Sequence, residues 1–243
     1  MLTIAKREFY FFFNNISGYL VLIGFSTINT LMLWFFDTPF NLLNIGFGDF
    51  SPFFELSPWL FLFLIPALSM RSFSEELSSG TFELLLTKPL KPSNIFGGKL
   101  IGLSLVLGIA IILTFINLVA LSALIEPNST LDWGSIIGSY ISLISVGLIF
   151  LAIGLCCSIL FRNQVTSFLL SLLVCFTQFY LWSFLADFTT IPWLYEFISD
   201  IGIQDHYLSL SRGIILFEDI IYFIGIFFIF FVFGIELIKK EQV

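Results

Sequence analysis

The fold is decided by residues 71–99, which read RSFSEELSSGTFELLLTKPLKPSNIFGGK. Long apolar runs flank this stretch on both sides. Because charged side chains are costly inside a bilayer, a charged segment between two hydrophobic runs must lie in water at one face of a membrane. Its seven charged residues are Arg71, Glu75, Glu76, Glu83, Lys88, Lys91 and Lys99.

The chain as a whole is unusually apolar. Of its 243 residues, 58% are hydrophobic and 11% are charged, whereas soluble domains carry about 25% charged residues. Such a chain cannot cover its surface with polar groups, so it is predicted to be a membrane protein. The N-terminal residues lack the small-residue cleavage site of a secretory signal, and we expect no cleavage. The net charge of −7 says little about partners, and we expect no nucleic-acid partner.

Six stretches are apolar enough, or nearly so, to form transmembrane helices, which need about 20 residues to cross the hydrocarbon of a bilayer. The sequence therefore predicts an all-α membrane protein in which residues 1–243 form one transmembrane domain. Pro58 and Pro66 lie in the second stretch and predict a kink there. The six stretches are residues 17–36, 53–70, 100–125, 135–161, 165–186 and 220–238.

The basic residues predict how the chain lies in the membrane, because Lys and Arg accumulate on the cytoplasmic side. With the N-terminus inside, only Arg212 among the ten Lys and Arg residues lies outside. Most acidic residues lie on the other side of the membrane, outside the cytoplasm. An even number of spans returns the C-terminus to the same side. We therefore expect a multi-pass protein of a bacterial inner membrane with both termini in the cytoplasm.

Two further segments are not expected to span. Residues 1–15 are predicted to form an amphipathic interfacial helix, with residues 6–8 as its polar part and residues 9–13 as its buried part. The alternative is that these residues are the irregular start of the first span. Residues 187–219 are predicted to be an extracytoplasmic segment that contains short interfacial or re-entrant helices, because half of its residues are apolar.

The charged segment is predicted to contain a short amphipathic helix over residues 81–87. Glu83 lies in its first turn and Lys88 at its end, which are the signs favoured by the helix dipole. The helix is too short and polar to cross a membrane, so its leucines should rest on lipid headgroups or in a groove of another protein. Ser78 or Ser79 is predicted to cap the helix, and Gly80 to form the turn just before it. Pro89 and Pro92 are predicted to stop the helix. Its apolar surface is formed by Leu84, Leu85 and Leu86.

The stretch SSGTFELLLTKPLKPSNIFGGKLIG, residues 78–102, resembles the signature of ABC-2 type transporter permeases. In that family the first cytoplasmic loop carries a Glu-x-x-x-Gly-Thr-x-Glu-x-Leu-Leu-x-x-Pro pattern, and Gly-Lys opens the third span. The order of elements also matches along nearly the whole chain. The matching residues are Glu76, Gly80, Thr81, Glu83, Leu85, Leu86, Pro89, Gly98 and Lys99.

This resemblance implies that residues 74–92 are a coupling segment that docks on a separate ABC ATPase subunit. The ATPase would bind ATP and Mg²⁺, so no cofactor is expected in this chain, and a second permease chain, identical or different, would complete the membrane part. Membrane lipid is the other expected partner. The residues implied to couple the two subunits are Glu76, Gly80, Thr81, Glu83, Leu84, Leu85, Leu86 and Pro89.

Residues 205–223, DHYLSLSRGIILFEDIIYF, are similar to a stretch of the gliding-motility-associated permeases of Bacteroidetes bacteria. This resemblance implies work in gliding motility, together with a larger membrane or periplasmic partner. The work would be export or mechanical work on the cell envelope.

An enzymatic reading finds little support in the sequence. His206 is the one histidine, which excludes two-His metal sites, and it is interpreted as structural. The nearest approach to a Walker A motif, at Gly98 and Lys99, has Ser93 in place of the first Gly and Leu100 in place of Ser or Thr. The chain is therefore predicted not to hydrolyse nucleotide, and Lys99 is predicted to anchor the third span at the inner face.

Three polar residues lie within the predicted spans. Asn29, Asn117 and Gln178 either hold helices together or line a translocation path, because polar groups inside a membrane are costly. No charged residue lies securely at mid-membrane depth, which argues against an ion-coupled carrier. A six-span scaffold or assembly factor without a transport path stays open as an alternative.

Overall fold

The fold is built from helices, and the part of the chain that is described contains no strand. The computed structural model describes residues 1–44, 48–87, 90–125, 131–213 and 216–241. The predicted all-α membrane class is confirmed. In chain order the elements are α1 Leu2–Asn14, α2 Ile16–Trp34, α3 Ser51–Ser78, α4 Thr81–Leu86, α5 Pro92–Leu124, α6 Trp133–Leu160, α7 Gln164–Phe176, the π-helical η1 Thr177–Leu181, α8 Trp182–Ala186, α9 Pro192–Ser199, α10 Ile203–Ser211 and α11 Phe217–Lys240.

Among the described residues, five helical segments are long and apolar enough to cross a membrane: α3, α5, α6, the continuous run α7–η1–α8, and α11. Helices α1 and α2 meet the same criterion together, but the pair is bent by 73°. If that pair counts as one span, the number is six. The bend lies at the predicted boundary between the interfacial helix and the first span.

Helices α3 and α5 are longer than the spans predicted for them. Helix α3 continues through Pro58 and Pro66 as one element and reaches Ser78. Helix α5 begins at Pro92, so the prediction that this proline stops a helix is wrong. Proline fits the first turn of a helix because its missing N–H has no partner there in any case. Both helices therefore extend well beyond the apolar stretches, toward the short helix α4 between them.

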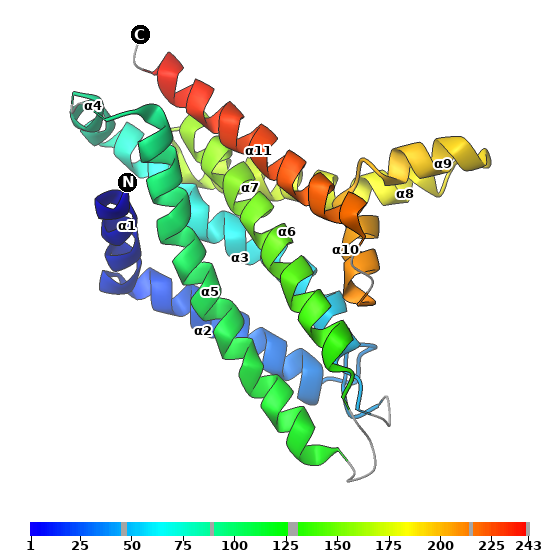
Figure 1. Ribbon diagram of the computed structural model, residues 1–243. Helices are drawn as coiled ribbons and strands as arrows, with labels where there is room; N and C mark the ends of the chain where they lie inside the picture. The colour runs from blue at the N-terminus through cyan, green and yellow to red at the C-terminus, as the bar shows by residue number, and fades with distance from the viewer. Residues whose placement is uncertain (45–47, 88–89, 126–130, 214–215, 242–243) are drawn as a thin grey trace.

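Helix α6 lies at the centre of the bundle. Its apolar window is 78% buried, against 17% for α7–η1–α8 and 17% for α11. The apolar faces of these two peripheral segments are uncovered in the isolated chain. Helix α4 and both termini lie at the same end of the bundle, which we call the α4 end (Figure 1).

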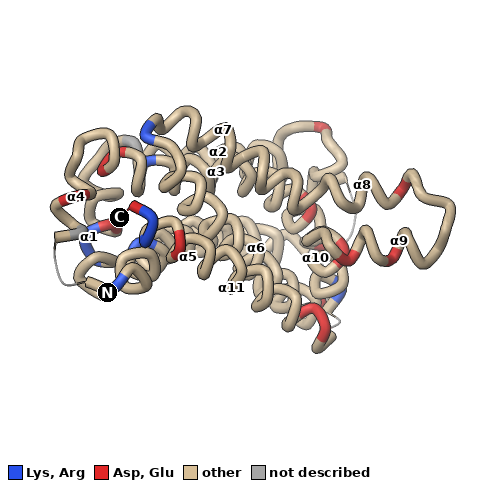
Figure 2. Tube along the Cα trace, turned by 90° about the horizontal axis from the view of Figure 1, so that it is seen from above, with Lys and Arg blue, Asp and Glu red and all other residues tan. Residues whose placement is uncertain are grey.

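The charged residues divide between the two ends of the bundle. Most Lys and Arg residues lie around α1, α4 and the C-terminus, whereas acidic residues are frequent near α8, α9 and α10 (Figure 2). This division matches the bias on which the predicted topology depends.

The segment between α8 and α11 is folded rather than irregular. Helices α8 and α9 form a hairpin that projects from the bundle, and α10 packs back against α6 (Figure 1). Tyr207 anchors α10, because its buried hydroxyl donates a 2.6 Å hydrogen bond to the carbonyl of Phe54 in α3. Burial, with a smaller contribution from the charge of Glu55, raises the pKa of Tyr207, so the hydroxyl keeps its proton.

Candidate functional site

A tight turn joins α3 to α4. Gly80 occupies it with φ of +72°, in the left-handed region that favours glycine. The hydroxyls of Ser78 and Ser79 donate to the carbonyl of Glu75 at 3.0 and 2.7 Å. The prediction that either serine caps α4 is therefore wrong. Both serines instead cap the C-terminal end of α3. The residue directly before α4 is Gly80, which has no side chain that could cap the helix.

Helix α4 has a buried face and an exposed face. Phe82 and Leu85 are 2% and 7% exposed, and the ring of Phe82 packs edge-to-face on Phe73 of α3 at 5.8 Å. Glu83 and Leu84 point outward, with Leu84 66% exposed. The predicted leucine surface is thus divided, since Leu85 holds the helix in place and Leu84 is free to meet a partner. The side chain of Leu86, and residues Lys88 and Pro89, lie outside the described part.

Behind α4, Lys99 of α5 is completely buried in an ionic cluster. Its Nζ donates a 2.6 Å hydrogen bond to Oε1 of Glu8 in α1 and lies 2.9 Å from Oε2 of Glu76 in α3. It also donates to the backbone carbonyl of Ser72. A buried ammonium group requires such partners, because its desolvation is otherwise uncompensated. Lys99 therefore connects three helices at the α4 end.

Lys99, predicted to anchor the third span at the inner face, is buried, and Glu8, predicted to lie in the polar part of a surface helix, is buried with it. The reason is the close approach of α1 to α5 at Gly98 and Gly102. A Cβ atom on Gly102 would lie 2.8 Å from the carbonyl oxygen of Ala5. Two glycines one turn apart thus form a groove into which α1 packs, and this packing buries both charges.

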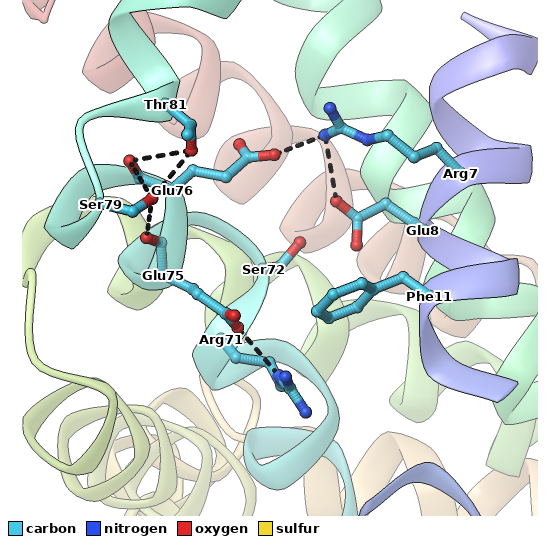
Figure 3. A pocket seen from close by; sticks show the side chains of 9 residues that line it. All are labelled: Arg7, Glu8, Phe11, Arg71, Ser72, Glu75, Glu76, Ser79 and Thr81. Carbon is cyan, nitrogen blue, oxygen red and sulfur yellow. Dashed lines mark hydrogen bonds and ion pairs between the residues drawn. The ribbon is translucent and has the colours of Figure 1, made fainter. Parts of the chain in front are cut away.

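A cleft of about 260 Å³ opens beside this cluster, between α1, α3 and α4 (Figure 3). Nη2 of Arg7 lies 2.5 Å from Oε1 of Glu76 and 3.7 Å from Oε1 of Glu8. On another wall Arg71 pairs with Glu75 at 3.1 Å. The cleft gives α4 a charged, water-accessible neighbour. It is lined by Arg7, Glu8, Phe11, Arg71, Ser72, Glu75, Glu76, Ser79 and Thr81.

Residues 52–235, more than half of the chain, match the family described as ABC-2 family transporter protein. The chain belongs to this family. It is therefore a membrane component of an ABC transporter, and its membership implies an ABC ATPase as partner. The match includes α4 and Lys99 and begins after α1. No curated protein matches the chain.

The structure separates the coupling residues predicted for this ABC-2 protein into two groups. Glu83 and Leu84 are exposed, and Thr81, whose hydroxyl lies 2.9 Å from Oγ of Ser79, is also exposed. Glu76 instead faces inward, where Arg7 and Lys99 occupy its carboxylate. Residues that the sequence analysis did not assign to this site are Arg7, Glu8, Phe82 and Lys99.

Of the three polar residues of the predicted spans, Asn117 and Gln178 hydrogen-bond to other elements of the fold, which favours helix packing for these two. Oδ1 of Asn117 accepts a 3.0 Å hydrogen bond from the indole of Trp34. Gln178 donates to the carbonyl of Ile201 at 3.0 Å. Asn29 is fully buried and donates to a carbonyl of its own helix.

His206 lies in a second polar cluster, near the opposite end of the bundle. Its Nδ1 is 2.6 Å from Oδ1 of Asp219, whose other oxygen accepts a 2.8 Å hydrogen bond from Ser209. Its Nε2 is 3.2 Å from the carbonyl oxygen of Asp200. These contacts tie α10 to the start of α11. The described residues include no group of side chains that would hold a metal ion, and the contacts favour a structural role.

The turn at Gly80 yields a first prediction. Replacing Gly80 with Val should destabilise the turn by about 1–2 kcal/mol, because a β-branched residue is strained in the left-handed region. Replacing it with Asn should cost less, because Asn tolerates that region. No atom lies within 4 Å of an added Cβ, so the backbone alone is tested. Limited proteolysis of the α3–α4 turn should be faster in Gly80→Val than in Gly80→Asn. Equal rates would contradict the assignment.

Proposed function

We propose that this chain is the permease subunit that couples ATP hydrolysis by a separate ATPase to transport or envelope work, with α4 as its coupling helix. The observation that carries this proposal is the division of α4 into two faces. Phe82 and Leu85 fix the helix to the bundle, while Glu83 and Leu84 present one charge and one apolar side chain to a partner. A short helix with this pattern fits into a groove of another protein.

Force applied to α4 has two direct routes into the membrane part. Helix α3 leads into α4 and α5 follows it, and each is long enough to span. The cluster around Lys99 joins these two helices to each other and to α1. A movement of α4 would therefore reach three helices at once.

The proposal places the α4 end, with both termini, in the cytoplasm of a bacterium and the chain in its inner membrane. The charge division between the two ends supports this orientation. ATP and Mg²⁺ would be bound by the ATPase subunit. This chain would contribute no catalytic residue and no cofactor site of its own.

The complex would contain a second permease chain, identical or different. The uncovered apolar faces of α7–η1–α8 and α11 leave room for such a partner among the surrounding lipids. The resemblance of residues 205–223 to gliding-motility permeases supports the narrower proposal of envelope work in gliding, with a larger membrane or periplasmic partner. Purification of the tagged chain, followed by mass spectrometry, should yield a Walker-motif ATPase and a further membrane chain. Recovery without any ATPase would contradict the proposal.

A second prediction concerns the exposed face of α4. Glu83→Lys and Leu84→Asp should each weaken binding of the ATPase at least about tenfold, because short recognition helices depend on a few contact residues. The matched control is Glu196→Lys, on the exposed surface of α9 away from α4. Affinity is measured by titration of the purified ATPase onto the permease in nanodiscs. Unchanged affinity in both α4 variants would exclude this face as the docking site.

A further inference from the structure

A side chain from α6 hydrogen-bonds to the backbone of α3 just before α4. Oγ of Ser158 accepts hydrogen bonds from the N–H groups of Phe73 at 2.9 Å and Ser74 at 3.0 Å, and it donates to the carbonyl of Met70 at 3.0 Å. In a regular helix these N–H groups bond to carbonyls four residues earlier. A hydroxyl has one proton and two acceptor sites, so Ser158 uses its full capacity on this one turn.

Close packing of α6 on α3 makes these hydrogen bonds possible. One turn before Ser158, Gly154 lies so near α3 that a Cβ atom would be 2.0 Å from Oγ of Ser69. Ser158, Phe73 and Ser74 are all fully buried, so water does not compete for these hydrogen bonds. The hydroxyl is therefore a fixed part of the contact between the two helices.

A second side chain acts on the same turn from another helix. Lys99 of α5 donates to the carbonyl of Ser72, which lies between Met70 and Phe73, two of the three residues that Ser158 contacts. Side chains from α5 and α6 thus bind the backbone of α3 at residues 70–74. Helix α3 is continuous through this turn, and side chains that engage the backbone of a helix mark places where a helix can bend.

The position of this turn indicates a role in the movement of α4. It separates the membrane-spanning part of α3 from the last turn of α3 and the coupling helix α4. We propose that residues 70–74 form the pivot on which α4 moves relative to the bundle, and that Ser158 is the positioning residue that ties this turn to α6. The proposal deepens the function proposed for α4 and rests on it. The geometry of the pivot, however, is a property of the chain alone and can be measured without the ATPase.

The test measures the bend directly in the full-length chain. Spin labels are attached at Phe63→Cys and Leu84→Cys, which are exposed positions on either side of the pivot, and the distance between them is measured in nanodiscs. The native cysteines are buried and should not react. Ser158→Ala removes the three hydrogen bonds that tie this turn of α3 to α6. A reorientation of about 20° over about ten helical residues should shift the mean distance by up to about 5 Å.

The matched control is Ser145→Ala, because Ser145 lies in the same helix and its hydroxyl donates to the carbonyl of Ile141 within that helix. It should leave the distance unchanged. If Ser158→Ala does not fold, Ser158→Cys keeps the size of the side chain, follows two native cysteines and supplies only a weak hydrogen-bonding group. It should shift the distance in the same way. A distance in the folded variant equal to that of the wild type would overturn the pivot.

Addition of the ATPase and ATP distinguishes a failure of the pivot proposal from a failure of the coupling role of α4. The wild-type distance should change with ATP, and this change should be lost in Ser158→Ala. If the isolated variant shifts but ATP moves nothing in the wild type, the coupling role of α4 fails and the pivot stands as a structural feature only. If ATP moves α4 equally in wild type and Ser158→Ala, the pivot is overturned and the coupling role is retained.

Discussion

Lys99→Met is expected to destabilise the protein by about 3–5 kcal/mol, because it removes one partner from a buried ion cluster and leaves the others uncompensated. Glu8 and Glu76, with side chains only 9% and 18% exposed, would remain next to each other, and Arg7 would be the cation paired with both. The quantity to measure is the free energy of unfolding in mixed detergent micelles.

Two controls isolate the cause of this loss. Lys239→Met removes a lysine that is 53% exposed and paired with Glu236, and should cost only about 0–1 kcal/mol. Adding Glu8→Gln and Glu76→Gln to Lys99→Met removes the uncompensated charges and should restore part of the lost stability. A triple variant no more stable than Lys99→Met would show that charge balance is not what holds the cluster.

Gly102→Leu is expected to have the second largest effect. The new side chain would collide with α1, since its Cβ would lie 2.7 Å from the Cβ of Glu8 and 2.8 Å from the backbone oxygen of Ala5. A backbone atom cannot move aside as a flexible side chain can, so α1 must leave α5. We expect a loss of about 1–3 kcal/mol from overpacking, together with release of Glu8 from Lys99.

Gly108→Leu provides the comparison on the same helix, because nothing lies within 4 Å of an added Cβ there. The unfolding free energy of this variant should stay close to that of the wild type. Release of α1 can be followed by thiol labelling of Ala5→Cys, which is buried in the wild type. If Ala5→Cys is protected equally in both glycine variants, the glycine groove does not hold α1.

Much of the architecture could be predicted from the sequence because hydrophobicity is a property of single residues. The apolar stretches predicted the long helices, and the interruption by charges at residues 71–99 predicted the short element between α3 and α5. Gly80 predicted the turn before α4, since a left-handed backbone favours glycine. Pro92 was misinterpreted because proline both stops one helix and suits the first turn of the next.

The ionic cluster could not be predicted in the same way, because it depends on a pairing across the fold. Glu8 and Lys99 lie 91 residues apart in the chain, and a lysine at the start of an apolar run looks the same whether it is exposed or paired. The role of Ser158 is equally invisible in the sequence, since serines in α6 such as Ser145 bond within their own helix. The available signal was Gly98 and Gly102, whose spacing indicates close helix contact but does not name the partner helix.

The orientation of α4 is the point on which the account depends, because an ATPase in the cytoplasm can reach this helix from one side of the membrane only. A membrane-impermeant maleimide applied to spheroplasts measures it, with Leu84→Cys on α4 and Phe188→Cys on the α8–α9 hairpin as the labelled positions. Both side chains are strongly exposed in the structure. The account predicts that Phe188→Cys is labelled in intact spheroplasts and that Leu84→Cys is labelled only after the membrane is broken. Labelling of Leu84→Cys in intact spheroplasts would contradict it.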